Sequence, residues 1–282
     1  MVDRNPWLNI LSHAVLVLGV AIVAFPLYLA LIASTHTAEA IVQSPMPLLP
    51  GAHMWENYRE ALLGSGKLGS NTNVVHMMWV SFWVAIIITV GKIAISLLSA
   101  FAIVYFRFPF KMICFWAIFL TLMLPVEVRI LPTYKVVAEL GMLNSYAGLT
   151  LPLIASATAT FLFRQFFLTV PDELVEAARI DGAGAMRFFK DILVPLSKTS
   201  IAALFVIQFI YGWNQYLWPS LMTTSEDMYP VVIGIKRMLA GGEAAVDWNI
   251  VMATAILAML PPTLVVMLMQ KWFVKGLVDT EK

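Results

Sequence analysis

Long apolar segments separated by short polar connections dominate the chain. Six of these segments reach the roughly 20 residues that a helix needs to cross a bilayer core about 30 Å thick. We therefore expect an all-α, polytopic membrane protein with six transmembrane helices. The first segment is too long, and has too little positive charge before it, for a cleaved signal peptide, so we expect it to remain. The expected helices cover residues 11–34, 78–105, 112–131, 146–168, 199–221 and 249–271.

The polar connections and the prolines refine this picture. The stretches WENYREALL, at 55–63, and TYKVVAELGML, at 133–143, predict two short helices on the outer surface. Pro152 lies in the fourth span, and Pro261 and Pro262 are expected to interrupt the sixth. Such breaks are tolerated where neighbouring helices satisfy the freed backbone groups. They favour a bundle around a cavity. No internal repeat is evident, so we expect one domain over residues 1–282.

The distribution of lysine and arginine predicts the orientation. With the N-terminus inside, eleven of the 18 basic residues fall on the cytoplasmic side and six fall outside, with Lys92 left within a helix. Cytoplasmic connections carry the excess of positive charge. Both termini and the long connection at 169–198 are therefore expected in the cytoplasm.

Composition excludes several classes of function. Only 12% of the residues are charged and 60% are hydrophobic, whereas about a quarter are charged in soluble domains. The net charge of +1 gives no reason to expect a nucleic-acid partner. The lone Cys114 rules out an internal disulfide. The four histidines lack the clustering that a metal site requires, so we expect no bound metal.

Catalytic patterns are also missing from the sequence. A phosphate-binding loop needs glycines, a lysine and then a hydroxyl residue. The best candidate, Gly91 and Lys92, has Ile86 in the place of the first glycine and Ile93 in the place of the hydroxyl residue. No serine–histidine–aspartate set or pair of carboxylates stands out within the spans. We expect a chain that is not an enzyme.

The connection at 169–198 holds an unusual concentration of charge. Pro171 and Asp172 suit a first helical turn, and Gly182 suits the end of a helix, which predicts a helix from Pro171 to Asp181. A second short helix, Met186 to Val194, ends at Pro195. Ala177 and Ala178 leave a flat face for another protein, which favours a docking element. The alternative is an amphipathic hairpin on the lipid headgroups, but its basic and acidic residues balance.

The spacing in this connection resembles a known family. Glu176-Ala177-Ala178 is followed after three residues by Gly182, and after nine more by Ile192, Val194 and Pro195. This resembles the EAA loop of membrane subunits of binding-protein-dependent ABC importers; Val194 stands where that pattern usually has leucine. EAARIDGA and YGWNQYLWP are similar to the maltose-type, carbohydrate-uptake branch, and LTLMLPVEVRI and KGLVDTEK to its glycerol-3-phosphate permeases.

The resemblance implies the type I importer fold and a set of partners in the bacterial inner membrane. The partners would be a second, non-identical permease, two copies of an ATPase that bind the ATP and Mg²⁺, and a periplasmic binding protein. This chain itself would bind no cofactor. Glu176 would pair with a basic ATPase side chain, Gly182 would allow the turn, and the alanines would permit close seating. The complete coupling set is Glu176, Ala177, Ala178, Asp181, Gly182, Ile192 and Pro195.

Candidate cargo contacts lie within the spans. An isolated charge such as Lys92 costs about 2.5–3.5 kcal/mol to insert deep in a helix, so either a functional role or a structural pair with the partner permease is expected. Gln215 stands where many relatives have an acid. The absence of a negative charge at this position would suit an anionic cargo. The tryptophans of this segment have a rival role as membrane anchors, and the threonines as partners of their own backbone. The candidates are Lys92, Thr158, Thr160, Trp213, Asn214, Gln215 and Tyr216.

The expected function is therefore a permease subunit for sn-glycerol-3-phosphate, with glycerophosphodiesters as further cargo. A permease for a neutral sugar or oligosaccharide is the alternative within the same class. A secondary carrier is disfavoured, because it would need coupling carboxylates within the helix interiors, and the sequence has none there; Glu127 lies near the end of its span.

Overall fold

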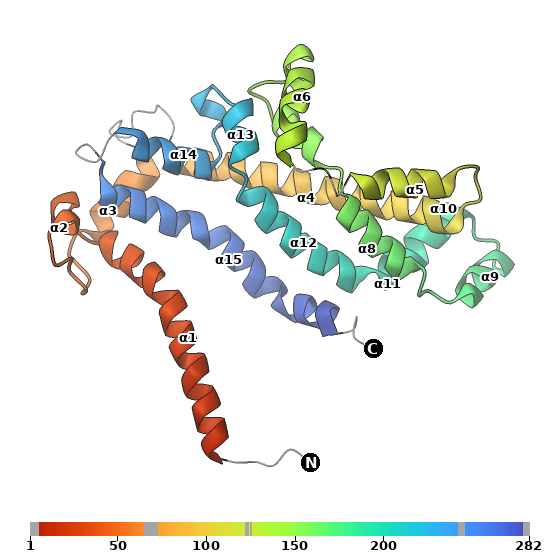
Figure 1. The fold of residues 1–282 in the computed structure, drawn as a ribbon, viewed down its shortest axis with the longest axis horizontal. Helices are drawn as coiled ribbons and strands as arrows, with labels where there is room; N and C mark the ends of the chain where they lie inside the picture. Colours follow the sequence, from red (N-terminus) through yellow and green to blue (C-terminus); the bar gives the residue numbers. More distant parts are fainter. Residues whose placement is uncertain (1–5, 65–72, 122–123, 125, 242–245, 279–282) are drawn as a thin grey trace. The chain divides into compact units, whose positions relative to one another are not determined.

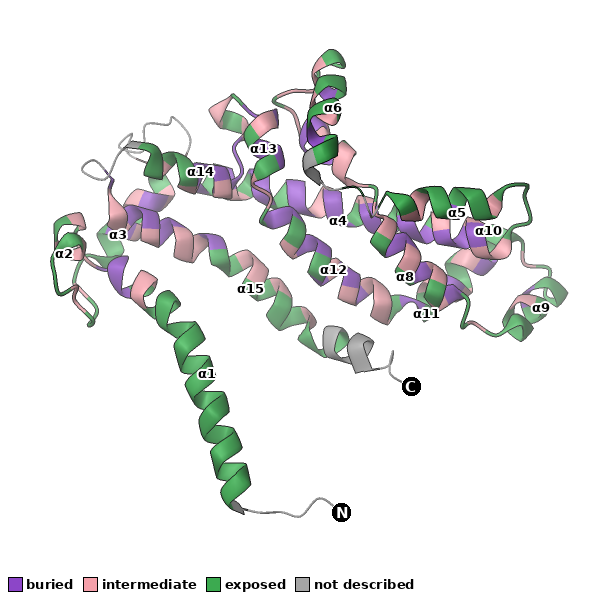
Figure 2. Ribbon diagram, viewed as in Figure 1, coloured by how far each residue is buried: buried purple, intermediate pink, exposed green. Residues whose placement is uncertain are grey.

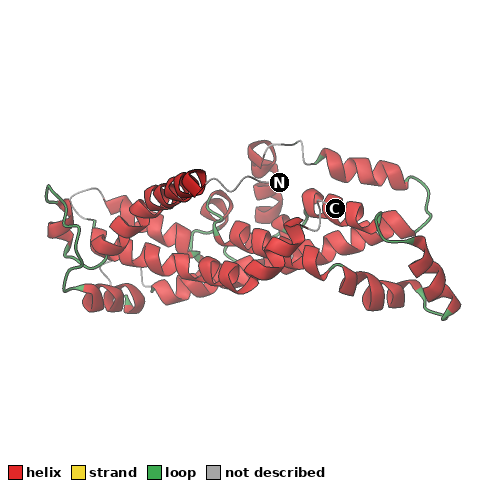
Figure 3. Cartoon of the chain, turned by 90° about the horizontal axis from the view of Figure 1, so that it is seen from below, coloured by secondary structure: helices red, strands yellow, loops and turns green. Residues whose placement is uncertain are grey.

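A computed structural model describes residues 6–64, 73–121, 124, 126–241 and 246–278 (Figure 1). Within these residues the regular structure is helical, with no strand (Figure 3), which confirms the all-α class. Two compact units can be distinguished, one formed by Met1–His76 and Gly234–Leu260, the other by Met77–Ile233 and Pro261–Lys282. The expectation of a single domain stays a prediction.

Three of the expected spans are confirmed as continuous helices. They are Trp7–Ala33 within α1 (Pro6–Ala33), the whole of α4 (Val74–Tyr105), and Trp248–Trp272 within α15 (Trp248–Val278). The interruption expected at Pro261 and Pro262 was wrong, because α15 continues through both residues. Local adjustment of the helix and its neighbours can satisfy the carbonyls that prolines leave free.

The third expected span, 112–131, is not one helix. It divides into α5 (Lys111–Leu120) and α6 (Val126–Glu139). Ten residues of α5 rise only about 15 Å, which is too short for a bilayer core. The sequence supplies the reason, because Pro125 cannot donate a helical hydrogen bond and disfavours the helical conformation of the residue before it.

The fourth and fifth expected spans are also broken. In the fourth, α7 (Tyr146–Thr150) and a 3-10 turn (Leu151–Leu153) meet α8 (Ala157–Phe167) at a bend of 46°. In the fifth, α12 (Lys198–Trp213) ends before α13 (Leu217–Met222) and instead meets the segment Ala185–Leu196 at a bend of 72°. By length and composition, the described residues therefore offer three spans, or up to five if each bent pair counts as one, rather than six.

Helices α4, α8 and α12 form much of the core of the second unit. At the α4–α12 crossing, a Cβ atom added to Gly212 would lie only 2.9 Å from the Cα atom of Ala85. Further along α4, Val80, Val84 and Ile88 pack in one cluster with residues of α6, α7 and α13. The indole of Trp218 in α13 donates a hydrogen bond of 3.1 Å to the carbonyl of Gly148 in α7.

Polar contacts organise the first unit. The side-chain amide of Asn57 in α3 (Met54–Leu63) donates to the carbonyls of Ser34 and His36, at 2.9 and 2.8 Å. Asn249 of α15 donates to the side-chain oxygen of Asn57 at 2.8 Å. Helix α3 confirms the short helix expected at 55–63, and its place on the outer surface stays a prediction. The short α2 (Ala38–Val42) follows α1, whose side chains are exposed along most of its length (Figure 2). The chain returns to this unit within α14 (Val231–Met238), which lies between 3-10 turns at Glu226–Met228 and Leu239–Gly241.

We expect Gly212→Leu to destabilise the protein by about 1–3 kcal/mol, the usual cost of overpacking a close contact. The new side chain would meet the backbone of α4, which cannot move aside as a flexible side chain can. Gly19→Leu in α1 is the matched control, because no heavy atom lies within 4 Å of its added Cβ. Thermal unfolding of the detergent-purified chain measures the difference. Equal midpoints for the two variants would show that the α4–α12 crossing is not tightly packed.

Candidate functional site

The first helix of the connection at 169–198 lies within one or two residues of its predicted bounds. The connection comprises α9 (Asp172–Ile180), α10 (Ala185–Phe188), a π-helical turn (Phe189–Leu193) and α11 (Val194–Leu196). The predicted end of the second helix at Pro195 was wrong, because Pro195 stands in the first turn of α11, where its missing N–H costs little, and helical structure continues to Leu196. Gly182 follows α9 with φ +72°, in the left-handed region that favours glycine. The N–H of Ala183 then donates to the carbonyl of Ala178 at 2.8 Å, which closes the helix end.

One face of this coupling loop, as we call residues 169–198, is anchored to the membrane helices. Ala178, Phe188 and Leu193 are buried in one cluster with side chains from α4 and α8. The ring centroids of Phe101 and Phe189 lie 4.9 Å apart. Those of Tyr105 and Phe188 lie 5.4 Å apart. Ile192 packs against the same cluster. The coupling loop is therefore packed against α4 and α8 through aromatic and aliphatic side chains.

The other face of the coupling loop is exposed. It carries Glu176, Ala177, Asp181 and Gly182, and Pro195 is also exposed. Glu176 makes no ion pair with any residue that the structure describes. The coupling set therefore divides into an outer face and an anchoring face. Ala178 departs from the expectation, since it packs within the chain and cannot seat a partner directly.

Sequence reasoning missed one feature of the outer face. Ile180, the last residue of α9, is 85% exposed, and Met186 of α10 is exposed as well. Both are large apolar side chains on an otherwise charged surface, where another protein could reach them. The sequence did offer a signal, an isoleucine at the end of a charged helix, just before Asp181 and Gly182.

Lys92 has partners within its own chain. Its side chain is only 6% exposed, and Nζ donates to Oε1 of Gln208 at 3.0 Å. The ammonium also lies over the ring of Tyr211, 3.7 Å from the centroid. Gln208 and Tyr211 are three residues apart on α12 and so share one face. An amide oxygen and a ring face stabilise a cation but do not neutralise it, and Lys92 forms no ion pair with a described carboxylate.

The remaining candidates are only partly brought together. Gln215 donates to the carbonyl of Tyr211 at 3.1 Å, which places it one turn beyond the Lys92 group. Trp213 is buried, Asn214 ends α12 and is exposed, and Tyr216 is partly buried.

The two threonines of α8 lie apart from that group. Thr160 is buried and donates to the carbonyl of Ser156 at 2.9 Å, the backbone alternative foreseen from the sequence, while Thr158 is exposed. No described hydrogen bond joins either one to Lys92. The sequence analysis did not identify Gln208 and Tyr211 as partners of Lys92, although a glutamine within an apolar span was a signal.

Where the structure describes the chain, no group of three or more histidine, cysteine, aspartate or glutamate residues is placed to hold a metal ion.

Comparison with known proteins decides the family. The family described as "Binding-protein-dependent transport system inner membrane component" matches residues 92–279, about two thirds of the chain and including the coupling loop. The chain belongs to this family. As a member, it is a multi-pass membrane component of a transport system, which bears out the resemblance in the EAA pattern.

Relatives and one solved structure match the chain over nearly its full length. The sn-glycerol-3-phosphate transport system permease proteins UgpE of Brucella melitensis and Agrobacterium fabrum are each 61% identical over 282 residues, with 100% of both chains covered. That of Escherichia coli O157:H7 is 58% identical over 283 residues, again with full coverage.

A chain of the crystal structure of a bacterial ABC transporter involved in the import of the acidic polysaccharide alginate matches with a TM-score of 0.78. The match covers 97% of this chain and 99% of that one at 21% identity. It shows that the two chains share a fold.

Proposed function

We propose that this family member is a permease subunit of an ATP-driven importer of sn-glycerol-3-phosphate, with glycerophosphodiesters as further cargo. The observation that carries this proposal is the identity of 58–61% to relatives of that name, sustained over the full length of both chains. A neutral-sugar cargo has less support, because a buried lysine without a carboxylate partner suits an anionic cargo better. A secondary carrier is disfavoured, because the chain carries a coupling loop.

The coupling loop would contact a partner ATPase and would move when that subunit binds and hydrolyses ATP. Its outer face offers Glu176 for a basic side chain, Ala177 for close approach and Ile180 for an apolar pocket. Its inner face would pass movement to α4 and α8 through the buried aromatic rings. This chain would hydrolyse no ATP and bind no cofactor itself. A second permease and a periplasmic binding protein would complete the importer, and both termini of this chain would be cytoplasmic.

The Lys92 group would supply the positive field that a phosphate-bearing cargo requires. Gln208 and Tyr211 fix the ammonium without cancelling its charge. Gln215, next to Tyr211, adds no negative charge where an acid would repel the phosphate. Trp213, Asn214 and Tyr216 would shape the adjoining break between α12 and α13. Thr158 is exposed and remains available to cargo, whereas the hydroxyl of Thr160 already bonds to its own helix.

Transport by the assembled importer tests the cargo assignment. We expect proteoliposomes containing both permeases and the ATPases, supplied with the binding protein, to accumulate labelled sn-glycerol-3-phosphate when ATP is present. Maltose should neither accumulate nor compete. Omitting ATP, and omitting the binding protein, are the controls. ATP-dependent accumulation of a neutral sugar, with none of glycerol-3-phosphate, would refute the cargo assignment while leaving family membership intact.

A further inference from the structure

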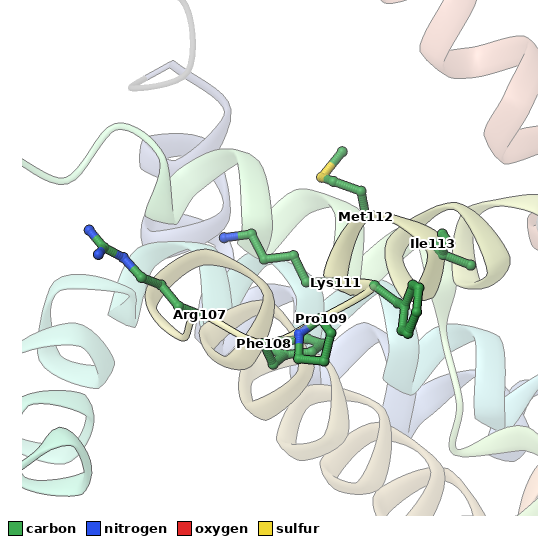
Figure 4. Close-up of a pocket in the computed structure, with 7 residues that line it drawn as sticks. Arg107, Phe108, Pro109, Lys111, Met112 and Ile113 are labelled. Carbon is green, nitrogen blue, oxygen red and sulfur yellow. The ribbon is translucent and has the colours of Figure 1, made fainter.

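The turn between α4 and α5 carries two basic residues, Arg107 and Lys111, and adjoins the coupling loop. Residues 107–113 line an open hollow of about 550 Å³ (Figure 4). The turn holds a bulky residue in an unfavourable conformation, since Phe110 has φ +63°. Such positions persist only where their surroundings fix them, and they concentrate at ligand sites. The conformation of Phe110 is therefore consistent with a ligand site in this turn.

Two cations of this turn lack an acidic partner. The charged ends of Arg107 and Lys111 extend toward the same side of the turn (Figure 4). Neither forms an ion pair with a described residue. Lys111 is also the first residue of α5, where the positive end of the helix dipole disfavours a second positive charge. Arg107 additionally lines a neighbouring cavity of about 280 Å³ together with Arg179. An anion placed here would relieve repulsion among all of these groups.

Exposed apolar side chains lie next to the two cations along the chain. Phe110 is 72% exposed and Ile113 64% exposed, and Met112 and Trp116 are exposed as well. Neighbouring apolar side chains this exposed are unusual on a surface that faces water alone. Tryptophan is enriched at the boundary between membrane and water. The combination of cations with exposed apolar groups matches a molecule that has both an anionic head and hydrocarbon chains.

We infer that residues 107–113 bind an anionic phospholipid of the membrane. Arg107 and Lys111 would donate hydrogen bonds to the lipid phosphate, and Phe110, Met112 and Ile113 would contact its acyl chains. Basic pockets at membrane helix ends bind anionic headgroups in this way. Inorganic phosphate would use the cations alone and leave the apolar side chains without a role. The proposed orientation of the chain would place this lipid in the cytoplasmic leaflet. Lipid binding itself does not depend on the proposed cargo.

Lipid association with the assembled importer tests this inference. Spin-labelled phosphatidylglycerol and phosphatidylcholine are compared in nanodiscs, without cargo or ATP. We expect the double variant Arg107→Gln and Lys111→Gln to lower the preference for phosphatidylglycerol about thirtyfold, from roughly 1 kcal/mol for each cation near an anionic surface. The matched control, Arg129→Gln with Lys135→Gln, removes two exposed cations of α6 and should leave the preference unchanged. Ile113→Ser should weaken both lipids equally.

Three outcomes would overturn the inference. The first is equal loss of preference in the matched control, which would indicate a general charge effect. The second is displacement of the lipid by millimolar-range inorganic phosphate, which would identify a free-phosphate site. The third is binding to the isolated chain but not to the importer, which would mean that a partner subunit covers the turn. A failed cargo assignment would leave the lipid measurement unaffected, so the two proposals can fail independently.

Discussion

Glu176→Lys is expected to abolish cargo uptake while the chain still folds and inserts. Glu176 is exposed on the outer face of α9 and has no ion-pair partner among the described residues, so its replacement disturbs no internal contact. Against a basic ATPase side chain, the variant replaces attraction by repulsion. Loss of one charge-assisted bond already costs about 1.5–3 kcal/mol, and reversal adds to that cost. Uptake should fall to background, together with recovery of the ATPase on an affinity-tagged permease.

A second charge reversal makes this result specific. Glu139→Lys introduces the same change on α6, where Glu139 is exposed and only 3.8 Å from Lys135 in a weak surface pair. This control should retain both uptake and ATPase recovery. Normal recovery of the ATPase with Glu176→Lys would exclude Glu176 from the docking contact. Equal thermal midpoints of the two variants are required, because they separate a docking defect from a folding defect.

Continuous spans and the coupling helix were predictable because their signals are local. The apolar runs of α1, α4 and α15 are long enough to specify a helix on their own. The first helix of the coupling loop carries its own stop signal at Gly182, which the structure places at φ +72°. Breaks were less predictable, because proline gives opposite results in different surroundings. The fourth span bends by 46° just after Pro152, whereas α15 continues through Pro261 and Pro262.

The division of the coupling loop into two faces lay beyond the sequence. Ala177 and Ala178 are identical residues, yet one is exposed and the other is buried. Successive residues are separated by about 100° around a helix, so burial depends on how the helix is rotated against its neighbours. Ala178 belongs to one apolar cluster with Phe101 and Tyr105, which lie far away along the chain. The partners of Lys92 were hidden for the same reason, because Gln208 is 116 residues away.

Lys92→Met is expected to raise the cargo concentration needed for half-maximal uptake by about ten- to a hundredfold. Losing a charge-assisted hydrogen bond costs about 1.5–3 kcal/mol. Each 1.4 kcal/mol corresponds to about a tenfold change in the half-maximal concentration. Methionine is an unbranched side chain one atom shorter than lysine, so it keeps most of the length and removes the charge. The bond to Gln208 is lost as well, but removing an uncompensated buried charge offsets that loss, so thermal stability should change little.

Transport kinetics separate a cargo role of Lys92 from a structural one. Lys135→Met is the matched control, since it removes an exposed lysine of α6 and should leave uptake unchanged. Lys92→Arg should retain part of the uptake, because it keeps the charge while altering the geometry above Tyr211. If Lys92→Met transports normally, the Lys92 group only ties α4 to α12. If it loses uptake only in proportion to a fall in thermal midpoint, the lysine is structural. A selective rise in the half-maximal concentration, with ATPase recovery intact, places its charge on the cargo pathway.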